Sequence, residues 1–231
     1  MEHTASRPYD QSCYTRPGNH AAGLVAQKKS LRASERDEAA REAFREQLKT
    51  RPATDFVIVD ECGSNLNLTP GYARAPRKQR AYGNVPRNTP ATTTLIASLT
   101  LQGMGAALVL PGATDHLAFE AYIEQVLVPT LRAGQIVVID NLSAHKSARV
   151  HSSISACGCE LWFLPSYSPD LSPIEQAFAK LKNAWRKAAA RTTDTLVDTI
   201  CTSLPTITAS DAASFFRDCG YQSQAPLAQS L

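Results

Sequence analysis

The chain has 231 residues, of which 43% are hydrophobic and 19% are charged, and its formal net charge is +3 at pH 7. This composition is ordinary for a globular protein and excludes a fibrous or wholly disordered chain. The length allows one large domain with a smaller appendage, and so small a net charge does not by itself indicate a nucleic-acid partner. The longest apolar stretches are strand-sized, well short of the roughly 20 residues that cross a bilayer, so we expect a soluble, cytoplasmic protein with no membrane partner.

Two segments precede the first predicted strand. Residues 1–29 hold little that could form a core, which predicts a flexible N-terminal arm. Ser34 followed by acidic residues is typical of a helix start, and Phe44 and Leu48 fall at helical spacing. We therefore predict an amphipathic linker helix over residues 30–50.

The strand-like segments are separated by turns or by helical patterns. Residues 55–60 form an apolar, β-branched run that ends in Asp60, and residues 135–139 form a similar run that leads directly to Asp140. Further strand patterns lie at 92–99 and 106–110, joined by a glycine-containing link of the hairpin type, and at 160–164. Helical spacing predicts helices over 117–131, 147–155, 173–190, 193–203 and 209–218.

The order of these elements predicts the fold class. Three strands with hairpin-like links are followed by helix, strand, helix, strand and helix. Helical crossovers make the last two strands parallel partners of the first, so we expect an α/β fold with a mixed five-stranded sheet flanked by helices. We assign residues 51–205 to this domain and residues 206–231 to a C-terminal helix and tail.

Three acidic residues stand where α/β proteins place their chemistry. Asp60 and Asp140 end predicted strands at the rim of the sheet, and Glu175 lies just inside a predicted helix. Carboxylates are suitable ligands for hard ions such as magnesium. Two such ions about 3.5 to 4 Å apart can activate the attacking oxygen and stabilise the leaving oxygen in a phosphodiester reaction. Residue spacing alone does not show that the three acids meet.

Glu175 also has an interpretation as a helix-capping residue. Ser172 and Glu175 form a capping-box pattern, with Pro173 at the first helical position. The carboxylate of Glu175 could therefore fold back and cap its own helix. Asp170 would then be the best substitute among the neighbouring acids.

Two residues next to the acids are weaker candidates for the same site. Glu61 adjoins Asp60 and should point to the opposite face of the strand, so we rank it below Asp60 as a ligand. His145 lies five residues beyond Asp140. It fits acid–base chemistry, a phosphate contact or a structural contact within its loop.

Three motifs are more specific than any spacing. In chain order they are Val59-Asp60-Glu61-Cys62-Gly63-Ser64, Val138-Ile139-Asp140-Asn141-Leu142-Ser143-Ala144-His145-Lys146, and Leu164-Pro165-Ser166-Tyr167-Ser168-Pro169-Asp170-Leu171-Ser172-Pro173-Ile174-Glu175. Together they resemble the catalytic domain of IS630-type transposases, the bacterial branch of the Tc1/mariner superfamily. Asp140 and Glu175 are separated by 34 residues, which is similar to the Asp, Asp, 34 residues, Glu pattern of that superfamily. The resemblance covers residues 28–205.

The resemblance implies a ribonuclease-H-like fold, with residues 51–205 as the DDE catalytic domain. It implies that Asp60, Asp140 and Glu175 are the catalytic residues and hold two magnesium or manganese ions. The expected activity is cut-and-paste transposition: water attack releases the transposon ends, and the freed 3′ hydroxyl then attacks target DNA at TA dinucleotides. The expected partner is double-stranded DNA, and the expected location is the bacterial cytoplasm, in association with the nucleoid.

Basic residues fall in two groups that we expect to contact DNA. The first is a segment with interleaved Tyr and Pro residues: Arg74, Arg77, Lys78, Arg80 and Arg87. The second lies near the other two acids: His145, Lys146, Lys182 and Arg186, with Lys180 as a further candidate. Cations bind phosphates without a sequence code, so these contacts would be sensitive to salt. A solvated loop is the alternative for the first group.

The chain departs from the family in two places. Position 172 is Ser where the family motif commonly has Asn, a mild change because both residues cap helices well. Full-length members begin with helix-turn-helix modules, for which the residues before the linker helix are too few. The chain therefore resembles the second frame of a split element or a truncated copy, with a separate helix-turn-helix polypeptide as partner and a homodimer as a further expectation. Two alternatives stay open: a non-catalytic DNA-binding or inhibitory remnant, and a general nuclease acting on RNA in hybrids.

Overall fold

The computed structural model describes residues 33–88, 92–142 and 145–222. The predicted arm over residues 1–29, the first residues of the linker helix and the tail beyond residue 222 lie outside these ranges. The described residues from Ser34 onward belong to one compact unit. Within the described ranges, no helix has the length and apolar character needed to cross a membrane.

A single five-stranded sheet organises this unit, with the strand order β3-β2-β1-β4-β5. The strands are β1 (Phe56–Ser64), β2 (Thr93–Thr100), β3 (Gly103–Pro111), β4 (Ile136–Ile139) and β5 (Glu160–Phe163). The first three strands pair antiparallel, whereas β4 pairs parallel with both β1 and β5. The predicted mixed five-stranded sheet is confirmed, and β1 lies at its centre.

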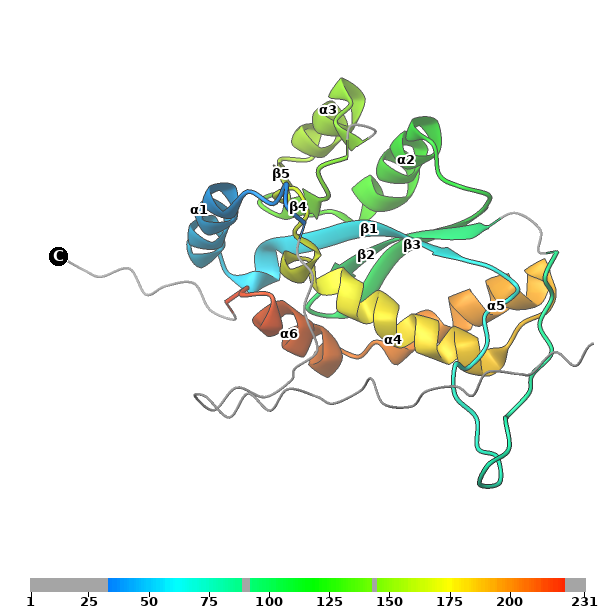
Figure 1. Ribbon diagram of the computed structural model, residues 1–231. Coiled ribbons are helices and arrows are strands. Elements are labelled where there is room, and N and C mark those ends of the chain that lie inside the picture. The colour runs from blue at the N-terminus through cyan, green and yellow to red at the C-terminus, as the bar shows by residue number, and fades with distance from the viewer. Residues whose placement is uncertain (1–32, 89–91, 143–144, 223–231) are drawn as a thin grey trace, which may run out of the picture. The chain divides into compact units, whose positions relative to one another are not determined.

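The helices cover both faces of the sheet. They are α1 (Glu38–Lys49), α2 (His116–Tyr122), α3 (Ala148–Ala156), α4 (Pro173–Ala188), α5 (Thr193–Ser203) and α6 (Ala209–Asp218). Figure 1 shows α2 and α3 on one face and α4, α5 and α6 on the other. The last four agree with the predicted helices to within one or two residues.

Two helices differ from the prediction at their ends. The side chain of Asp37, and not that of Ser34, caps α1 by accepting the backbone N–H of Ala40 at 3.0 Å. The helix predicted over 117–131 is regular only as α2 and continues as a wide π turn and a short 3-10 turn. Pro129 explains this change, because its ring has no N–H to donate and clashes with the carbonyl one turn earlier.

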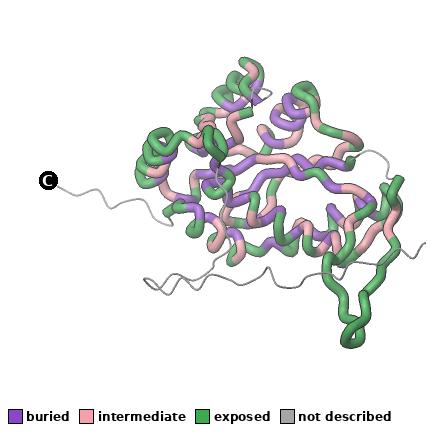
Figure 2. Tube along the Cα trace, viewed as in Figure 1, coloured by how far each residue is buried: buried purple, intermediate pink, exposed green. Residues whose placement is uncertain are grey.

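Alternation along β1 divides the core between the two faces of the sheet. Phe56 and Ile58 face a cluster that includes the apolar stripe predicted on α4, whereas Val57 and Val59 face the cluster under α2 and α3. Phe44 of α1 and Phe216 of α6 belong to the first cluster. Figure 2 shows these strands buried between helices whose outer sides are exposed. The core therefore fixes α4 against the same face of β1 to which the next even-numbered residue, Asp60, belongs.

Candidate active site

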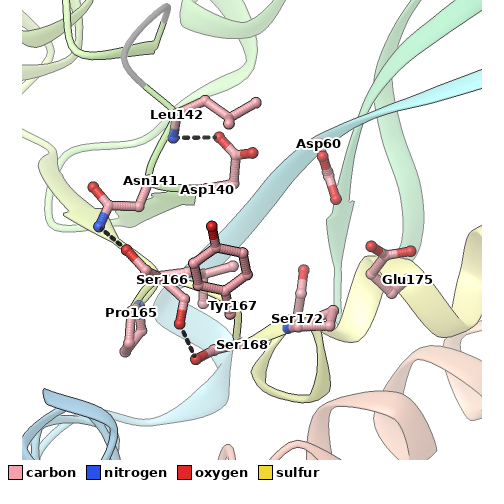
Figure 3. Close-up of a pocket in the computed structure, with 12 residues that line it drawn as sticks. Asp60, Asp140, Asn141, Leu142, Pro165, Ser166, Tyr167, Ser168, Ser172 and Glu175 are labelled. Carbon is pink, nitrogen blue, oxygen red and sulfur yellow. Dashed lines mark hydrogen bonds between the residues drawn. The ribbon is translucent and has the colours of Figure 1, made fainter. Parts of the chain in front are cut away.

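The three predicted acids come from three different elements and line one cavity. Asp60 lies on β1, Asp140 directly follows β4, and Glu175 lies in the first turn of α4, which packs against β1. The cavity has a volume of about 410 Å³. Its wall is formed by Asp60, Asp140, Asn141, Leu142, Leu164, Pro165, Ser166, Tyr167, Ser168, Pro169, Ser172 and Glu175. Figure 3 shows Asp60 and Glu175 to the right of Tyr167 and Asp140 above it. Parallel pairing of β1 with β4 brings the first two acids to one region. The prediction that Asp60 ends its strand is wrong, because β1 continues to Ser64 in antiparallel pairing with β2.

Asp60 is the acid most affected by its surroundings. Burial raises the pKa of its carboxyl group to about 7, and the charges of Glu175 and Asp140 act in the same direction. The backbone N–H of Glu61, which donates to Asp60 Oδ1 at 2.7 Å, opposes this shift. Negative charge is therefore crowded at this point, and a cation would relieve it.

Asp140 is held in place by two contacts to the same carboxylate oxygen. The backbone N–H of Leu142 donates to Oδ1 at 3.2 Å, and Nδ1 of His145 contacts the same atom. The other oxygen, Oδ2, makes no hydrogen bond to the residues that the structure describes. Asp140 is thus oriented through one oxygen while the second remains available to a ligand.

His145 lies between two acids on the α2 face of the sheet. Its Nε2 atom is 3.3 Å from Glu61 Oε2, and its ring stacks on Phe119 with the centroids 3.9 Å apart. Burial lowers the pKa of His145, but its hydrogen bonds to Asp140 and Glu61 and their charges outweigh this effect and raise the pKa to about 9. Glu61 therefore meets the α2 face, opposite Asp60, as strand alternation predicts. Only 3% of His145 is exposed, so its ring has almost no surface for the DNA contact proposed from the sequence.

The start of α4 does not contain the predicted capping box. Ser172 precedes the helix, but its side chain makes no capping hydrogen bond, and its buried Oγ atom has no partner among the described residues. The interpretation of Glu175 as a cap is therefore wrong. The reason is local: Ser172 closes a 3-10 turn over Pro169–Leu171, with its own N–H donating to the Pro169 carbonyl at 3.0 Å. Glu175 is exposed at the cavity.

Asp170, the proposed substitute for Glu175, is engaged elsewhere. Its two carboxylate oxygens accept hydrogen bonds from Arg41 of α1, at 3.0 and 2.6 Å. It does not line the cavity with the other acids. The structure thus excludes Asp170 from the role that the sequence left open for it.

The basic segment that contains Arg74, Arg77, Lys78, Arg80 and Arg87 has no regular secondary structure and is exposed at all five residues. Its two tyrosines, Tyr72 and Tyr82, are 97% and 89% exposed. Figure 1 shows the segment running away from the sheet beyond the end of α4. Arg191 holds the base of the segment by donating to the Leu66 and Leu68 carbonyls at 3.0 Å each. Since α4 has 16 residues, its two ends lie roughly 24 Å apart, so the base of the segment is remote from Glu175.

The second basic group has varied surroundings. Lys146 is exposed and lies 5.7 Å from the centre of the Phe163 ring. Lys182 is half-buried near Cys62, where burial raises the pKa of the thiol to about 11 and the lysine charge opposes that rise. Arg186, on the same stripe of α4, donates to Asn183 at 2.9 Å. Lys180 is paired with Asp211 at 2.7 Å.

The three carboxylates line one cavity without converging on a point. Within the described ranges, no three His, Cys, Asp or Glu side chains stand close enough together to hold a metal ion as they are placed. The donors nevertheless fit a hard divalent ion in kind, because all three are carboxylates and their mutual repulsion contributes to the raised pKa of Asp60. Binding would require these side chains to rotate toward one another, and the charge of the ion would remove the repulsion.

Sequence reasoning did not single out Tyr167 or Arg41. Tyr167 lines the cavity, is 59% exposed and has a left-handed backbone with φ of 54°. No local sequence pattern predicts that backbone conformation. Arg41 does carry a signal, because it lies three and seven residues before Phe44 and Leu48 and therefore on the apolar side of α1.

Comparisons with known proteins identify the family and the fold of the chain. A family model described as DDE superfamily endonuclease matches residues 55–197, more than half of the chain. A structure described as a pre-cleavage Mos1 transpososome matches with a TM-score of 0.67 and 14% sequence identity, and covers 86% of this chain and 64% of that chain. The catalytic domain of Mos1 mariner transposase matches with a TM-score of 0.58 and 16% identity, and covers 85% of this chain and 93% of that chain. No curated protein matches the sequence.

The structural matches establish the fold. At 14 and 16% identity they do not by themselves carry a function, but they confirm the ribonuclease-H-like sheet predicted from the motifs. The chain spans 64% of the length of the first Mos1 chain, whereas it covers 93% of the Mos1 catalytic domain. The similarity to Mos1 therefore lies mainly in the catalytic domain of that protein.

Proposed function

Because the chain belongs to the DDE superfamily of endonucleases, we propose that it is the catalytic part of a DNA transposase. It cleaves transposon ends and joins them to target DNA by a cut-and-paste route, with insertion at TA dinucleotides. One observation carries the proposal: Asp60, Asp140 and Glu175 come from three elements and line a single cavity. Three acids around one open cavity match the needs of phosphodiester chemistry.

The same three residues would hold two magnesium or manganese ions. Such ions activate the attacking oxygen and stabilise the leaving oxygen. Structures of Mos1 described as paired-end complexes with Mn and with Mg support this choice of metal. Asp60 must give up its proton to act as a ligand, because its pKa lies near 7 before any ion binds.

The chain's own residues prepare the site for this reaction. His145 and the Leu142 N–H fix one oxygen of Asp140 and leave the other without a hydrogen bond to the described residues, so that it can bind an ion. Leu142, Leu164 and the Pro165–Pro169 loop form the wall of the cavity in which the reacting phosphate would lie. Glu175, at the start of α4, supplies its carboxylate from the exposed side of the cavity.

DNA is the proposed partner, both as transposon ends and as target. A Mos1 structure described as a paired-end complex with the left transposon end supports this assignment. Backbone contacts would come from Arg74, Arg77, Lys78, Arg80 and Arg87 and from Lys146, Lys182 and Arg186. Of the second group, Lys146 is exposed, and Lys182 and Arg186 are half-buried on the stripe of α4 that carries Glu175. A homodimer, and a separate helix-turn-helix polypeptide that selects the ends, complete the proposed assembly in the nucleoid.

The test is cleavage of DNA that carries the element's terminal repeats, in magnesium or manganese, by the chain and by Asp140→Asn. We expect strand cleavage by the chain and none by the variant. Cleavage that survives Asp140→Asn would remove the proposed mechanism. Cleavage only after a helix-turn-helix polypeptide is added would support the split arrangement, and DNA binding without cleavage under any of these conditions would favour a non-catalytic remnant.

A further inference from the structure

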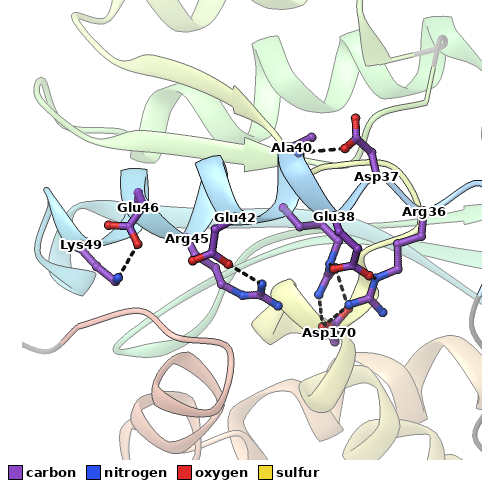
Figure 4. A network of polar contacts seen from close by, with 10 residues as sticks. Arg36, Asp37, Glu38, Ala40, Glu42, Arg45, Glu46, Lys49 and Asp170 are labelled. Carbon is purple, nitrogen blue, oxygen red and sulfur yellow. Dashed lines mark hydrogen bonds and ion pairs between the residues drawn. The ribbon is translucent and has the colours of Figure 1, made fainter.

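Arg41 is a fully buried arginine that joins α1 to the loop before α4. None of its side chain is exposed, and its guanidinium makes a two-pronged contact with Asp170, at 3.0 and 2.6 Å, although 129 positions separate the two residues. Glu38 lies 3.3 Å from Arg41 Nε, and Arg36 approaches both Glu38, at 2.8 Å, and Asp170, at 3.8 Å. Figure 4 shows Arg36, Glu38 and Asp170 gathered where α1 passes over the turn that carries Asp170.

An ion pair whose guanidinium is fully buried is a costly way to stabilise a fold. Removing a guanidinium from water carries a large desolvation cost, and apolar side chains of similar size often stabilise a core equally well. What the planar guanidinium adds is direction, because two parallel hydrogen bonds fix both the position and the orientation of the carboxylate. The pair is therefore better suited to placing the turn than to adding stability.

The turn that Asp170 belongs to leads directly into α4. It covers Pro169–Leu171, and Leu171 is buried in the core, with its carbonyl accepting the hydroxyl of Tyr221 at 3.1 Å. Ser172 follows and provides no side-chain cap for the helix. Because this usual anchor of a helix start is missing, the first turn of α4 is held by the burial of Ile174 in the core and by the preceding 3-10 turn.

The same turn also forms part of the cavity. Pro169 lines it together with Ser168, whose hydroxyl donates to the Ser166 carbonyl at 3.1 Å. The Ser166 hydroxyl in turn accepts from Asn141, the residue after Asp140, at 3.1 Å. A continuous set of contacts thus runs from the second acid, through the loop, to the turn that Arg41 holds and on to the third acid.

We propose that Arg41 is a positioning residue of the active site. By holding Asp170, it fixes the turn over Pro169–Leu171 and with it the first turn of α4, so that Glu175 faces the cavity shared with Asp60 and Asp140. This proposal rests on the proposed metal-dependent cleavage. The effect of Arg41 on ion binding can be measured separately from any effect on DNA binding. Arg41 itself touches neither ion nor DNA.

The experiment compares Arg41→Met and Asp170→Asn with the unchanged chain. Arg45→Met is the matched control, because Arg45 lies on the same helix and pairs with Glu42 at 3.1 Å, but is 38% exposed and makes no ion pair with Asp170 among the described residues. Three quantities are measured: the melting temperature, the Kd for Mn²⁺ alone by titration calorimetry, and kcat and KM for DNA cleavage at saturating Mn²⁺. Asp170→Glu tests rescue, since it keeps the charge.

We expect Arg41→Met and Asp170→Asn to weaken Mn²⁺ binding about 10-fold or more and to lower kcat by a similar factor, in line with the effect of residues that orient metal ligands. KM for DNA should stay unchanged, Asp170→Glu should recover part of the loss, and Arg45→Met should match the unchanged chain. Variants that melt earlier but keep the original Kd and kcat when folded would overturn the proposal, because Arg41 would then serve only the fold.

Two further outcomes separate this proposal from the proposed function. If Arg41→Met fails to fold, Asp170→Asn tests the proposal in its place. The Asp170 side chain is 52% exposed, so this position tolerates the change better. If the unchanged chain cleaves no DNA but binds Mn²⁺ in a manner that depends on Arg41, positioning is supported and the transposase function is not. If the unchanged chain binds no Mn²⁺, both are overturned.

Discussion

Two irregular segments leave the sheet, and they are built in opposite ways. The loop over residues 165–172 is tied to its surroundings by hydrogen bonds to Arg41, Asn141 and Tyr221 and by the burial of Leu171. The segment over residues 65–88 is exposed along most of its length and is held at its base by Arg191. The first carries no net excess of positive charge, whereas the second gathers five basic residues.

This difference separates two tasks that an enzyme acting on DNA must perform. Chemistry at a phosphate needs groups held to within a fraction of an ångström, which requires a packed and hydrogen-bonded loop. Attraction to a phosphate backbone needs only positive charge within reach, so an exposed segment suffices. Substitutions in the first loop should therefore change rate and ion binding, and substitutions in the second should change DNA affinity.

The largest effect is expected at the acids beside the tied loop. Glu175→Gln removes a proposed ion ligand and should lower the cleavage rate by about 1,000-fold or more, equivalent to about 4 kcal/mol of transition-state stabilisation. DNA affinity should stay within a few-fold of the unchanged chain. Single-turnover cleavage and filter binding measure the two quantities. Glu42→Gln, an exposed acid on α1, is the control, and a Glu175→Gln variant that keeps a tenth of the rate would contradict the assignment.

The second effect concerns the exposed segment. Replacing Arg74, Arg77, Lys78 and Arg80 with Gln should make the logarithmic salt dependence of DNA binding shallower by about 3 to 4, because each lost phosphate contact removes about 0.9 from the slope. The melting temperature and the Kd for Mn²⁺ should not change. Titrations across a range of salt concentrations measure the slope. The control is a variant in which Arg45 and Arg217 are both changed to Gln. An unaltered slope in the variant with four substitutions would mean that the segment is solvated and does not contact DNA.

A smaller effect is expected where the exposed segment is anchored. Arg191→Ala removes the hydrogen bonds to the Leu66 and Leu68 carbonyls and should lower the free energy of unfolding by about 1 kcal/mol. Backbone amides over residues 65–70 should exchange with solvent faster, while those of residues 165–172 stay protected. Hydrogen exchange with mass spectrometry resolves the two segments. Equal acceleration in both would mean that the segments are not independent.

The smallest effect concerns acid. Burial pushes the pKa of Asp170 upward, but hydrogen bonds and charge from Arg41 and the charge of Arg36 outweigh it and leave the pKa below its ordinary value of 3.8. The stability that this carboxylate contributes is therefore present above its ordinary pKa and is lost as the pH falls through the lowered value. The difference in unfolding free energy between the unchanged chain and Asp170→Asn should shrink as the pH falls from 6 toward 2. Urea denaturation measures it, and a difference that does not vary with pH would contradict the ion pair.

Local patterns were sufficient for much of the fold and for part of the site. Alternation and β-branched residues predicted the strands that lead to Asp60 and Asp140, and the spacing of Ile174, Phe178 and Trp185 predicted the buried side of α4, all three of which are buried. These patterns are local, so they can be recognised in the sequence without knowledge of the tertiary structure. The expectation that the three acids act together came from the motif resemblance, not from periodicity.

The remaining features depend on contacts between distant segments. Nothing near Asp170 in the sequence indicates that Arg41 will bind it, and the pattern of Ser172 and Glu175 predicted a cap that the turn before it displaces. His145 was grouped with the DNA-contacting cations, yet packing against Phe119 encloses it between Glu61 and Asp140. For Arg41 and His145 tertiary packing outweighs a local preference, whereas the start of α4 is decided by the neighbouring 3-10 turn.

The core that α1 and α6 share with the sheet determines where the chain can be cut. Phe44 packs edge-on against Trp162 with the ring centres 6.3 Å apart, and Tyr221 packs in the same way against Phe56 at 4.9 Å. The N–H of Ala53 also donates to the Gln222 carbonyl at 2.6 Å. A recombinant fragment limited to residues 51–205 would expose Phe56 and Trp162 and aggregate, whereas one spanning residues 34–222 keeps every one of these contacts.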